Sequence, residues 1–264
     1  MLSKNKSRFI ISLQKKKVRE EEGLFVIEGD KIVKEFLAAG VQLQTLIAKK
    51  EFISGLTLSV REQISEIEDA TYEELKHIST LKTPHNALAI VRIPEKQMNI
   101  PEMVNQLCAA LDCVQDPGNL GTIIRAAAWF GIGNIVCSPD CVDVFNPKVI
   151  QASMGAILHV NVFYSDLKSF LEEALENKSA VYGALLEGEP VYGKNLAGKG
   201  VILLGNESRG ISADLMPFIT DKIMIPGAGR GIPGIESLNV GMAASVIFSE
   251  FRRQTDGSIS FKTL

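Results

Sequence analysis

The sequence predicts an α/β protein with two domains, and three observations support this. Short apolar runs alternate with segments whose apolar residues recur at helical spacing. A polar stretch bounded by two prolines, at residues 93–101, interrupts the chain. The length of 264 residues lies where chains commonly divide into domains. We therefore expect a small domain at residues 1–94, a linker at 95–104 and a larger domain at 105–264.

The first domain is predicted to be a small α/β unit. Residues 25–29 have the composition of a short strand, and residues 30–39 carry apolar side chains at helical spacing until Gly40 ends the pattern. Residues 43–48 form the next predicted strand, and 87–91 form a β-like run before the linker. This alternation of elements indicates one sheet covered by helices.

The larger domain is predicted to hold a mostly parallel sheet with helices on both faces, because near-continuous apolar strands alternate with helices. The predicted strands are 109–114, 134–138, 159–163, 180–185, 201–204 and 222–225, and the predicted helices are 120–130, 166–176 and 237–252. Ligands of such sheets bind in loops beyond the carboxyl ends of strands. We therefore expect a site in the loops that follow Val114, Leu204 and Ile225.

The first of these loops has the sequence D-P-G-N-L-G-T-I-I-R and leads into a helix. Asn119 is placed to cap that helix. Arg125 stands between apolar residues, so a buried position is expected, and a buried guanidinium needs an anion or another acceptor. Taken alone, this arginine is more often part of a structural ion pair than of a site.

The second and third loops carry a similar mixture of residues. Gly205 and Gly210 permit close backbone approach after an apolar strand, while Glu207 and Arg209 add charge. Ser237 is a natural N-cap for the last helix. A polar turn and a helix cap are sufficient structural explanations for these two loops taken singly.

Together the three loops are much more specific. The patterns N-x-G-x-x-x-R, G-N-E-x-x-G and I-P followed by S-L-N-V occur in this order, and they resemble the SpoU (TrmH) family of RNA ribose methyltransferases, in the SPOUT superfamily, over about residues 105–254. Residues 23–29 and 83–89 resemble, more loosely, the substrate-binding domain of this family. The resemblance implies a trefoil knot, S-adenosylmethionine as cofactor, and a homodimer formed through the methyltransferase domain.

The resemblance also assigns residues. It places Arg125 beside the ribose 2′-hydroxyl, with Glu207 holding the guanidinium and Asn119 orienting the ribose or Arg125. It adds Ser237 and Asn239 to the same pocket. The residues expected to meet the cofactor, largely through backbone groups, are Gly205, Ile225 and Leu238. Because a guanidinium is effectively always protonated, we expect Arg125 to position groups and stabilise an alkoxide rather than to act as an ordinary base.

Residues 227–236 form a longer link than this family usually has, and Arg230 within it is a candidate RNA contact. Residues 229–234 also match the G-x-G-x-x-G pattern of dinucleotide-binding oxidoreductases. That alternative is weak, because Pro233 lies inside the turn and too few residues follow for a further βαβ unit.

The charge distribution favours an RNA partner. The net charge is only −3, yet residues 1–19 contain no acid and seven cations: Lys4, Lys6, Arg8, Lys15, Lys16, Lys17 and Arg19. These cations are expected to contact RNA phosphates, and the alternative is a frayed, solvated terminus. Ribosomal RNA is favoured slightly over transfer RNA as the target.

Other classes of function find little support in the sequence. The four cysteines have no zinc-binding spacing, so we expect reduced, mostly buried thiols in a cytoplasmic protein without a metal. No apolar run is long enough to span a membrane. A non-catalytic RNA-binding or ribosome-assembly factor on the same fold remains the main alternative to an enzyme.

Overall fold

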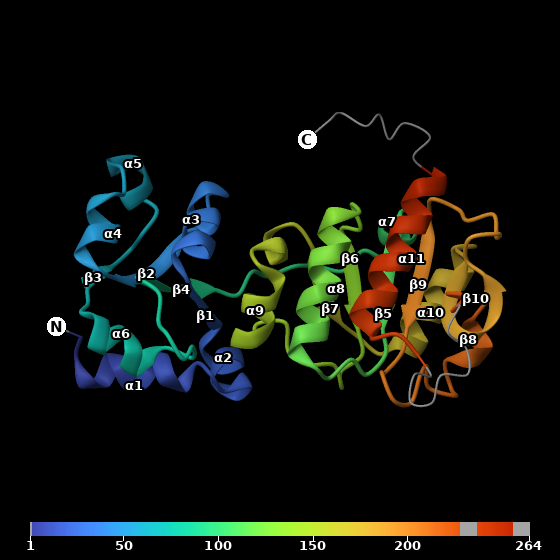
Figure 1. Cartoon of the computed structure of the whole chain (residues 1–264), viewed down its shortest axis with the longest axis horizontal. Helices are drawn as coiled ribbons and strands as arrows, with labels where there is room; N and C mark the ends of the chain where they lie inside the picture. Colours follow the sequence, from blue (N-terminus) through green and yellow to red (C-terminus); the bar gives the residue numbers. More distant parts are fainter. Residues whose placement is uncertain (1, 228–236, 256–264) are drawn as a thin grey trace. The chain divides into compact units, whose positions relative to one another are not determined.

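The computed structural model describes residues 2–227 and 237–255, shown in Figure 1. The chain divides into two compact units. Unit 1 contains residues 1–96 and 143–158, and unit 2 contains residues 97–142 and 159–264. Residues 143–158 thus pack with the N-terminal part of the chain, although strands of unit 2 precede and follow them.

Unit 1 has a four-stranded sheet in the order β1-β4-β2-β3. Strand β4 is antiparallel to both of its neighbours, and β3 is parallel to β2. The strands are β1 (Leu24–Glu28), β2 (Leu43–Ala48), β3 (Ile67–Asp69) and β4 (Ala87–Arg92). The predicted strands of this part are confirmed, and the short β3 is an addition.

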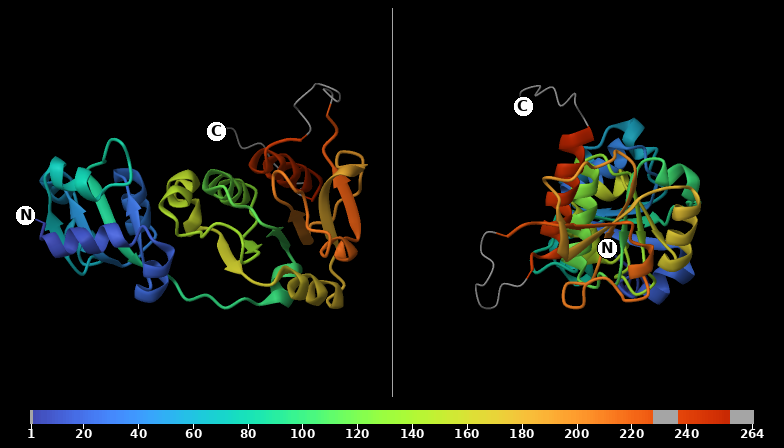
Figure 2. Two further views of the ribbon diagram at one scale, coloured as in Figure 1. Left: turned by 90° about the horizontal axis from the view of Figure 1, so that it is seen from below. Right: turned by 90° about the vertical axis from the view of Figure 1, so that its right-hand side faces the viewer.

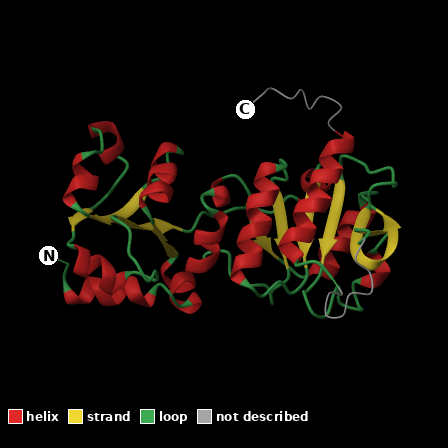
Figure 3. Ribbon diagram, viewed as in Figure 1, coloured by secondary structure: helices red, strands yellow, loops and turns green. Residues whose placement is uncertain are grey.

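Helices cover both faces of this sheet, as Figure 3 shows. The helices of unit 1 are α1 (Lys4–Ser12), α2 (Lys16–Glu22), α3 (Asp30–Ala38), α4 (Lys50–Ser54), α5 (Leu58–Arg61), α6 (Tyr72–Ile78) and α9 (Pro147–Ser153), with a 3₁₀ turn η1 (Ala156–Leu158). Because side chains alternate along a strand, neighbouring residues of β1 serve opposite faces. Phe25 and Ile27 pack with α3 and α4, whereas Leu24 packs with α1 and α6.

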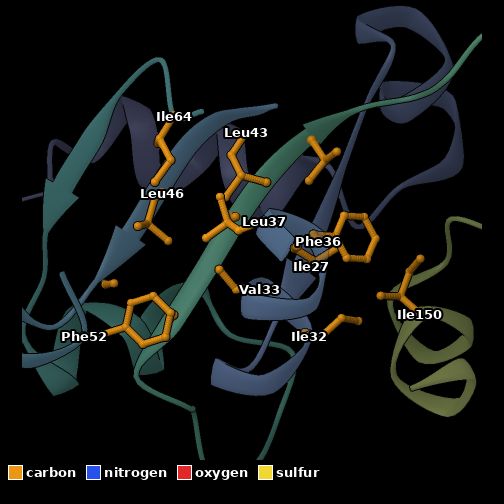
Figure 4. Packing of buried hydrophobic residues seen from close by; sticks show 14 of the residues in the cluster. Ile27, Ile32, Val33, Phe36, Leu37, Leu43, Leu46, Phe52, Ile64 and Ile150 are labelled. Carbon is orange, nitrogen blue, oxygen red and sulfur yellow. The ribbon is translucent and has the colours of Figure 1, made fainter. Parts of the chain in front are cut away.

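The larger core of unit 1 lies between the sheet, α3, α4 and α9 (Figure 4). Ile150 of α9 is fully buried in this core, next to apolar residues of β1 and α3. The ring of Phe145, just before α9, lies 4.6 Å from that of Phe25. A segment distant in sequence therefore supplies part of the core of unit 1.

The N-terminal cations do not all face solvent, which corrects the expectation for residues 1–19. Arg19 is only 2% exposed, forms an ion pair with Asp143, and donates to the carbonyl oxygens of Leu13 (2.9 Å) and Gln14 (2.8 Å). The ammonium of Lys6 lies between two carboxylates of the β3 region. Two of the seven cations therefore hold the fold together.

The N-terminus is also not frayed. Leu2, Ile10 and Leu13 are buried in the second core of unit 1, together with Leu75 and Ile78 of α6. Ser3 caps α1 by accepting from the backbone nitrogen of Lys6 at 3.2 Å. Residues 2–13 are therefore an integral part of unit 1.

Unit 2 has a six-stranded, fully parallel sheet in the order β10-β8-β9-β5-β6-β7. The strands are β5 (Leu107–Leu111), β6 (Asn134–Cys137), β7 (Asn161–Tyr164), β8 (Val181–Pro190), β9 (Gly200–Leu204) and β10 (Asp221–Met224). All six predicted strands are present. Strand β8 is longer than expected, and its pairing with β10 shifts register between Lys222 and Ile223.

Helices cover both faces of this sheet as well, which confirms the predicted layers. The helices are α7 (Ile100–Val104), α8 (Pro117–Trp129), α10 (Leu167–Glu176) and α11 (Val240–Thr255), with a 3₁₀ turn η2 (Met216–Phe218). Figure 2 shows α8 beside α11 on one face and α7 with α10 on the other. Cys108 and Ala110 of β5 face the α7–α10 layer with Phe170, because alternate residues of a strand share a face.

In residues 2–227 and 237–255, no helix is long and apolar enough to cross a membrane. The trefoil knot, the long 227–236 link with Arg230, and the G-x-G-x-x-G alternative all involve residues 228–236, which lie outside the described residues. The knot therefore stays a prediction.

Candidate functional site

The candidate site lies at the carboxyl edge of the unit 2 sheet. Strands β9 and β5 are neighbours, and since all strands are parallel, their carboxyl ends meet at the same edge. The loop after β5 leads into α8, and the loop after β9 contains the G-N-E-x-x-G pattern. The loops predicted to form the site after β5 and β9 therefore lie at one edge of the sheet.

The start of α8 differs from the prediction in one respect that matters for the site. Asp116, not Asn119, is the N-cap, and its Oδ1 accepts from the backbone nitrogen of Asn119 at 2.8 Å. Pro117 occupies the first turn, where its missing N–H costs nothing. The helix therefore begins earlier than expected, which leaves the Asn119 side chain free for other partners.

Those partners come from the other two loops. Nδ2 of Asn119 donates to Oε1 of Glu207 at 2.5 Å, and Oδ1 of Asn119 accepts from Nδ2 of Asn239 at 2.8 Å. Both ends of the Asn119 amide are used, so its orientation is determined. Three segments far apart in the sequence thus converge on one side chain, as the sequence predicted.

Asn239 also caps α11, which corrects the expected role of Ser237. Its Oδ1 accepts from the backbone nitrogens of Gly241 (3.0 Å) and Met242 (3.3 Å), and the helix begins at Val240. Ser237 is exposed and lies before the cap. One asparagine therefore serves both as the helix cap and as a hydrogen-bond partner in the site.

Close packing of α8 on α11 supports this arrangement. A Cβ atom at Gly241 would lie 3.0 Å from Cγ2 and 3.1 Å from Cβ of Thr122, and 3.2 Å from Oδ1 of Asn239. These distances are shorter than ordinary van der Waals contact, so a glycine at this position lets the two helices approach. Thr122 itself donates to the carbonyl oxygen of Gly118 at 2.8 Å.

Arg125 is exposed, and the expectation of a buried guanidinium was wrong. The reason is helical periodicity. One face of α8 is buried and includes Leu120, Ile123, Ile124 and Ala127. Arg125 lies between these residues in sequence, but the turn of the helix places its side chain on the opposite, exposed face. Apolar neighbours in sequence therefore did not imply an apolar environment. Arg125 lies one helical turn after Thr122, on the helix that contacts α11.

Gly205 is required by the backbone path after β9. A Cβ atom there would lie 2.2 Å from the carbonyl carbon of Gly210 and 2.3 Å from the nitrogen of Ile211. Asn206 and Gly210 exchange two backbone hydrogen bonds of 3.0 and 2.9 Å, which close the turn between them. Any larger residue at 205 would force this turn away from β9.

The remaining predicted cofactor contacts lie at the same end of the strands. Ile225 follows β10 directly and is half-buried, and Leu238 precedes the α11 cap with 50% of its surface exposed. Their contact with a cofactor, like the roles of Arg125 and Ser237, stays a prediction.

The sequence reasoning did not assign Asp112 or Cys113, which follow β5 directly. Asp112 is buried, and its Oδ2 accepts from the backbone nitrogen of Ser212 at 2.7 Å. Cys113 has a φ of +56° and accepts through its carbonyl oxygen from Nδ2 of Asn206 at 2.8 Å. Both residues hold the loop after β9 in place. Their position immediately after an apolar strand was the available signal.

The cysteines agree with the expectation of free thiols. Cys108, Cys137 and Cys141 are buried, and Cys113 is half-buried. A hydrogen bond from the thiol of Cys137 lowers the pKa of Cys141 to about 7 despite burial. Across the described residues, no group of three or more His, Cys, Asp and Glu side chains is arranged to hold a metal ion.

An open parallel sheet, with polar residues converging at its carboxyl edge, defines this unit as a ligand-binding α/β domain. The chain belongs to the SpoU rRNA methylase family, whose model matches residues 106–249. Residues 4–89 match the MRM3-like substrate binding domain.

Similar proteins share nearly the whole chain. The 23S rRNA (guanosine(2553)-2′-O)-methyltransferase RlmP of Bacillus subtilis is 29% identical over 241 residues, which cover 91% of this chain and 93% of RlmP. The human mitochondrial rRNA methyltransferase 3 is 26% identical over 297 residues, which cover 90% of this chain and 70% of the human protein.

Solved structures confirm the fold of both units. A protein of the TrmH family from Porphyromonas gingivalis is 35% identical, with a TM-score of 0.86 and coverage of 97% of this chain and 100% of that chain. The AdoMet-bound rRNA methyltransferase from Sinorhizobium meliloti is 25% identical, with a TM-score of 0.81 and coverage of 96% and 97%.

Proposed function

We propose that this protein is an S-adenosylmethionine-dependent methyltransferase that modifies a ribose 2′-hydroxyl of ribosomal RNA. The observation that carries the proposal is the convergence of Asn119, Glu207 and Asn239, one from each family pattern, in a single hydrogen-bonded chain. Relatives that match about nine tenths of this chain are named as ribosomal RNA methyltransferases, and the name of RlmP specifies the 2′-oxygen.

The residues present fit the cofactor. A side chain at Gly205 would collide with the backbone of Gly210 and Ile211, so the glycine keeps the turn after β9 close to the end of the strand. Ile225 is half-buried and Leu238 is 50% exposed, so both can offer apolar surface to a ligand. These three residues would hold S-adenosylmethionine, which supplies, when bound, a methyl group already activated by a sulfonium sulfur. Good alignment of reacting groups can lower a barrier by about 7–11 kcal/mol, so positioning is the main task left to the protein.

Arg125 would carry the charge-stabilising part of that task. Its exposure on α8 lets the guanidinium meet a ribose or phosphate oxygen of an incoming RNA. Because it stays protonated, it would stabilise the oxygen as the hydroxyl proton leaves to a phosphate or to water. We expect Glu207 to hold Arg125 with the oxygen that Asn119 does not use, and Ser237 to line the same pocket.

A methyl-transfer assay tests the proposal. Ribosomal RNA from cells that lack this protein is incubated with the purified protein and radiolabelled S-adenosylmethionine, and ribose methylation is mapped by nucleotide. We expect incorporation into one ribosomal RNA and none into transfer RNA. RNA binding without incorporation would instead support the non-catalytic assembly factor, and incorporation only into transfer RNA would contradict the proposed substrate.

We further propose that residues 1–94 contact RNA, that 105–264 carry the reaction, and that 95–104 link them. The exposed cations on and between α1 and α2 are Lys4, Arg8, Lys15, Lys16 and Lys17. Within the described residues, Lys4, Arg8 and Lys15 form no ion pair. Changing these three to glutamate should weaken RNA binding and flatten its dependence on salt. This test is sharper than deleting residues 1–19, which would also remove Leu2, Ile10 and Leu13 from the core.

We also propose a homodimer formed through the α8–α11 face of unit 2. Trp129 of α8 is 77% exposed and Met242 of α11 is 57% exposed. Exposure of such large apolar surfaces to water is unfavourable in free energy. A second copy of this face would cover both. The four free thiols favour a reducing compartment, so we expect the protein to work in the cytoplasm.

A further inference from the structure

Arg209 lies in the turn that carries Glu207, and neither the family patterns nor the proposed mechanism uses it. Its guanidinium is exposed, and Nη2 donates to Sγ of Cys113 at 3.0 Å. Within the described residues it forms no ion pair. The five donors of a guanidinium suit phosphate recognition, and the bond to Cys113 occupies only one of them.

The turn around Arg209 is held firmly. Oδ1 of Asn206 accepts from the backbone nitrogens of Ser208 (3.0 Å) and Arg209 (3.1 Å). Nδ2 of the same asparagine donates to the carbonyl oxygen of Cys113 at 2.8 Å. Cys113 therefore anchors the turn through its backbone and the guanidinium through its sulfur. An arginine fixed at both ends loses less rotamer entropy when it binds a ligand.

The charge of Arg209 is not neutralised by its thiol partner. Partial burial raises the pKa of Cys113 above its ordinary value of 9.0, and this effect outweighs the opposing influence of Arg209 itself. The thiol is therefore neutral at pH 7 and acts only as a weak acceptor. The carboxylates of Asp112 and Asp140 also lie near this thiol. Asp112 is buried and accepts a hydrogen bond from the backbone nitrogen of Ser212, and within the described residues neither carboxylate forms an ion pair with Arg209.

Arg209 also lies close in the chain to Glu207, a residue of the candidate site. It is two positions after Glu207, so the Cα atoms of the two residues lie within about 7 Å of each other. Glu207 in turn contacts Asn119 of α8. A phosphate held by Arg209 would therefore belong to the methylated nucleotide or to its neighbour.

We infer that Arg209 is a substrate-binding residue that holds an RNA phosphate beside the methylated ribose, positioned by Cys113. The inference rests on the proposed function. It differs from the role of Arg125, because Arg209 would bind the substrate equally in the ground state and in the transition state. A loss of Arg209 should therefore raise KM for RNA and leave kcat nearly unchanged.

The test compares Arg209→Ala, Arg209→Lys and Lys199→Ala with the unaltered protein. Lys199 is a matched control, since it is an exposed cation just before β9, at the opposite end of that strand. The substrate is an unmodified 23S ribosomal RNA transcript. Methyl-transfer kinetics, calorimetric binding of S-adenosylmethionine, and filter binding of the RNA at several salt concentrations are measured.

For Arg209→Ala we expect a KM for RNA roughly ten- to a hundredfold higher, the range for a lost hydrogen bond to a charged group. We expect a slope of log affinity against log salt shallower by about 0.7–0.9, the value for one phosphate contact. Arg209→Lys should recover part of the affinity, and Lys199→Ala should change neither quantity. Cofactor affinity should be the same in all four proteins.

Two results would overturn the inference: an unchanged salt slope in Arg209→Ala, or a fall in kcat at constant KM. The binding measurement decides the matter even if the unaltered protein transfers no methyl group to this RNA. In that case the transfer assay contradicts the proposed function, while the salt dependence of RNA binding by Arg209→Ala still decides whether Arg209 contacts a phosphate.

Discussion

Asn119 and Glu207 lie 88 positions apart in the sequence, yet their side chains meet in a hydrogen bond of 2.5 Å. Asn239 joins the same amide from the other side at 2.8 Å. This relationship ties the loops after β5 and β9 to the start of α11. Any model of the reaction must therefore treat the three loops as one structure.

A double-mutant cycle measures how strongly this structure is coupled. We expect Asn119→Ala and Glu207→Gln each to reduce kcat/KM for methyl transfer, and the double variant to be no worse than the poorer single variant. Residues in direct contact typically show coupling of about 0.5–3 kcal/mol. Losses that simply add in the double variant would show that the two side chains act independently.

Arg125→Ala should abolish methyl transfer and leave cofactor binding nearly intact. The loss of one charge-stabilising donor typically costs about a hundredfold or more in kcat. Because Arg125 is exposed, the substitution should change stability by no more than about 0.5 kcal/mol. Radiolabel incorporation, calorimetry with S-adenosylmethionine and thermal denaturation check the three expectations. Near-full activity of the variant would contradict the assigned role.

Arg19→Ala should destabilise unit 1 strongly. The substitution leaves Asp143 without its buried partner and removes donors to two backbone carbonyls, and breaking such a pair costs about 3–5 kcal/mol. Urea denaturation of the whole chain measures the loss. Lys17→Ala is the control, since Lys17 is exposed. A fragment of residues 1–96 should also be unstable, because it lacks Asp143 and Ile150; a cooperatively folded fragment would contradict this.

The stability contributed by Glu74 should depend on pH. Its carboxylate accepts from the backbone nitrogens of Thr71 and Leu2, both at 2.8 Å, and these bonds lower its pKa below the ordinary value of 4.5. A lowered pKa in the folded state means that the ionised group stabilises the fold above about pH 4.5. This contribution is lost as pH falls through the folded-state pKa.

We therefore expect Glu74→Gln to be less stable than the unaltered protein at pH 7, and the difference to shrink as pH falls toward 3. Urea denaturation at several pH values gives this difference. Glu73→Gln, at an exposed neighbouring position, should show little pH dependence of its effect. A difference for Glu74→Gln that stays constant with pH would contradict the assigned role of its carboxylate.

Trp129→Glu should yield a monomer, because it places a charge in the proposed interface. Sedimentation velocity reports the mass of each form. Trp129 is the one tryptophan of the chain, so its fluorescence should shift to shorter wavelength as the unaltered protein dimerises on concentration. Leu58→Glu, at an 80% exposed position of unit 1, is the control and should leave the mass unchanged. A dimer that survives Trp129→Glu would place the interface elsewhere.

Local patterns in the sequence were sufficient to predict the class of the fold and to bring the candidate site residues to one edge of the sheet. Alternation of apolar strands with helices specifies a parallel sheet through local periodicity, and the six strands of unit 2 occur where that periodicity placed them. The order of the three loop patterns also identified the family. These features follow from short-range spacing, which a sequence displays directly.

Which side chains meet depends on packing between distant segments. The apolar neighbours of Arg125 predicted a buried side chain, but the helix places it on an exposed face. Asn119 was predicted to cap α8, but Asp116 is the N-cap. Arg19 looked like part of a basic tail and is a buried ion-pair partner of Asp143. In each case the partner or environment depends on a residue or helix face that local sequence does not specify. Long-range packing alone brings such groups together.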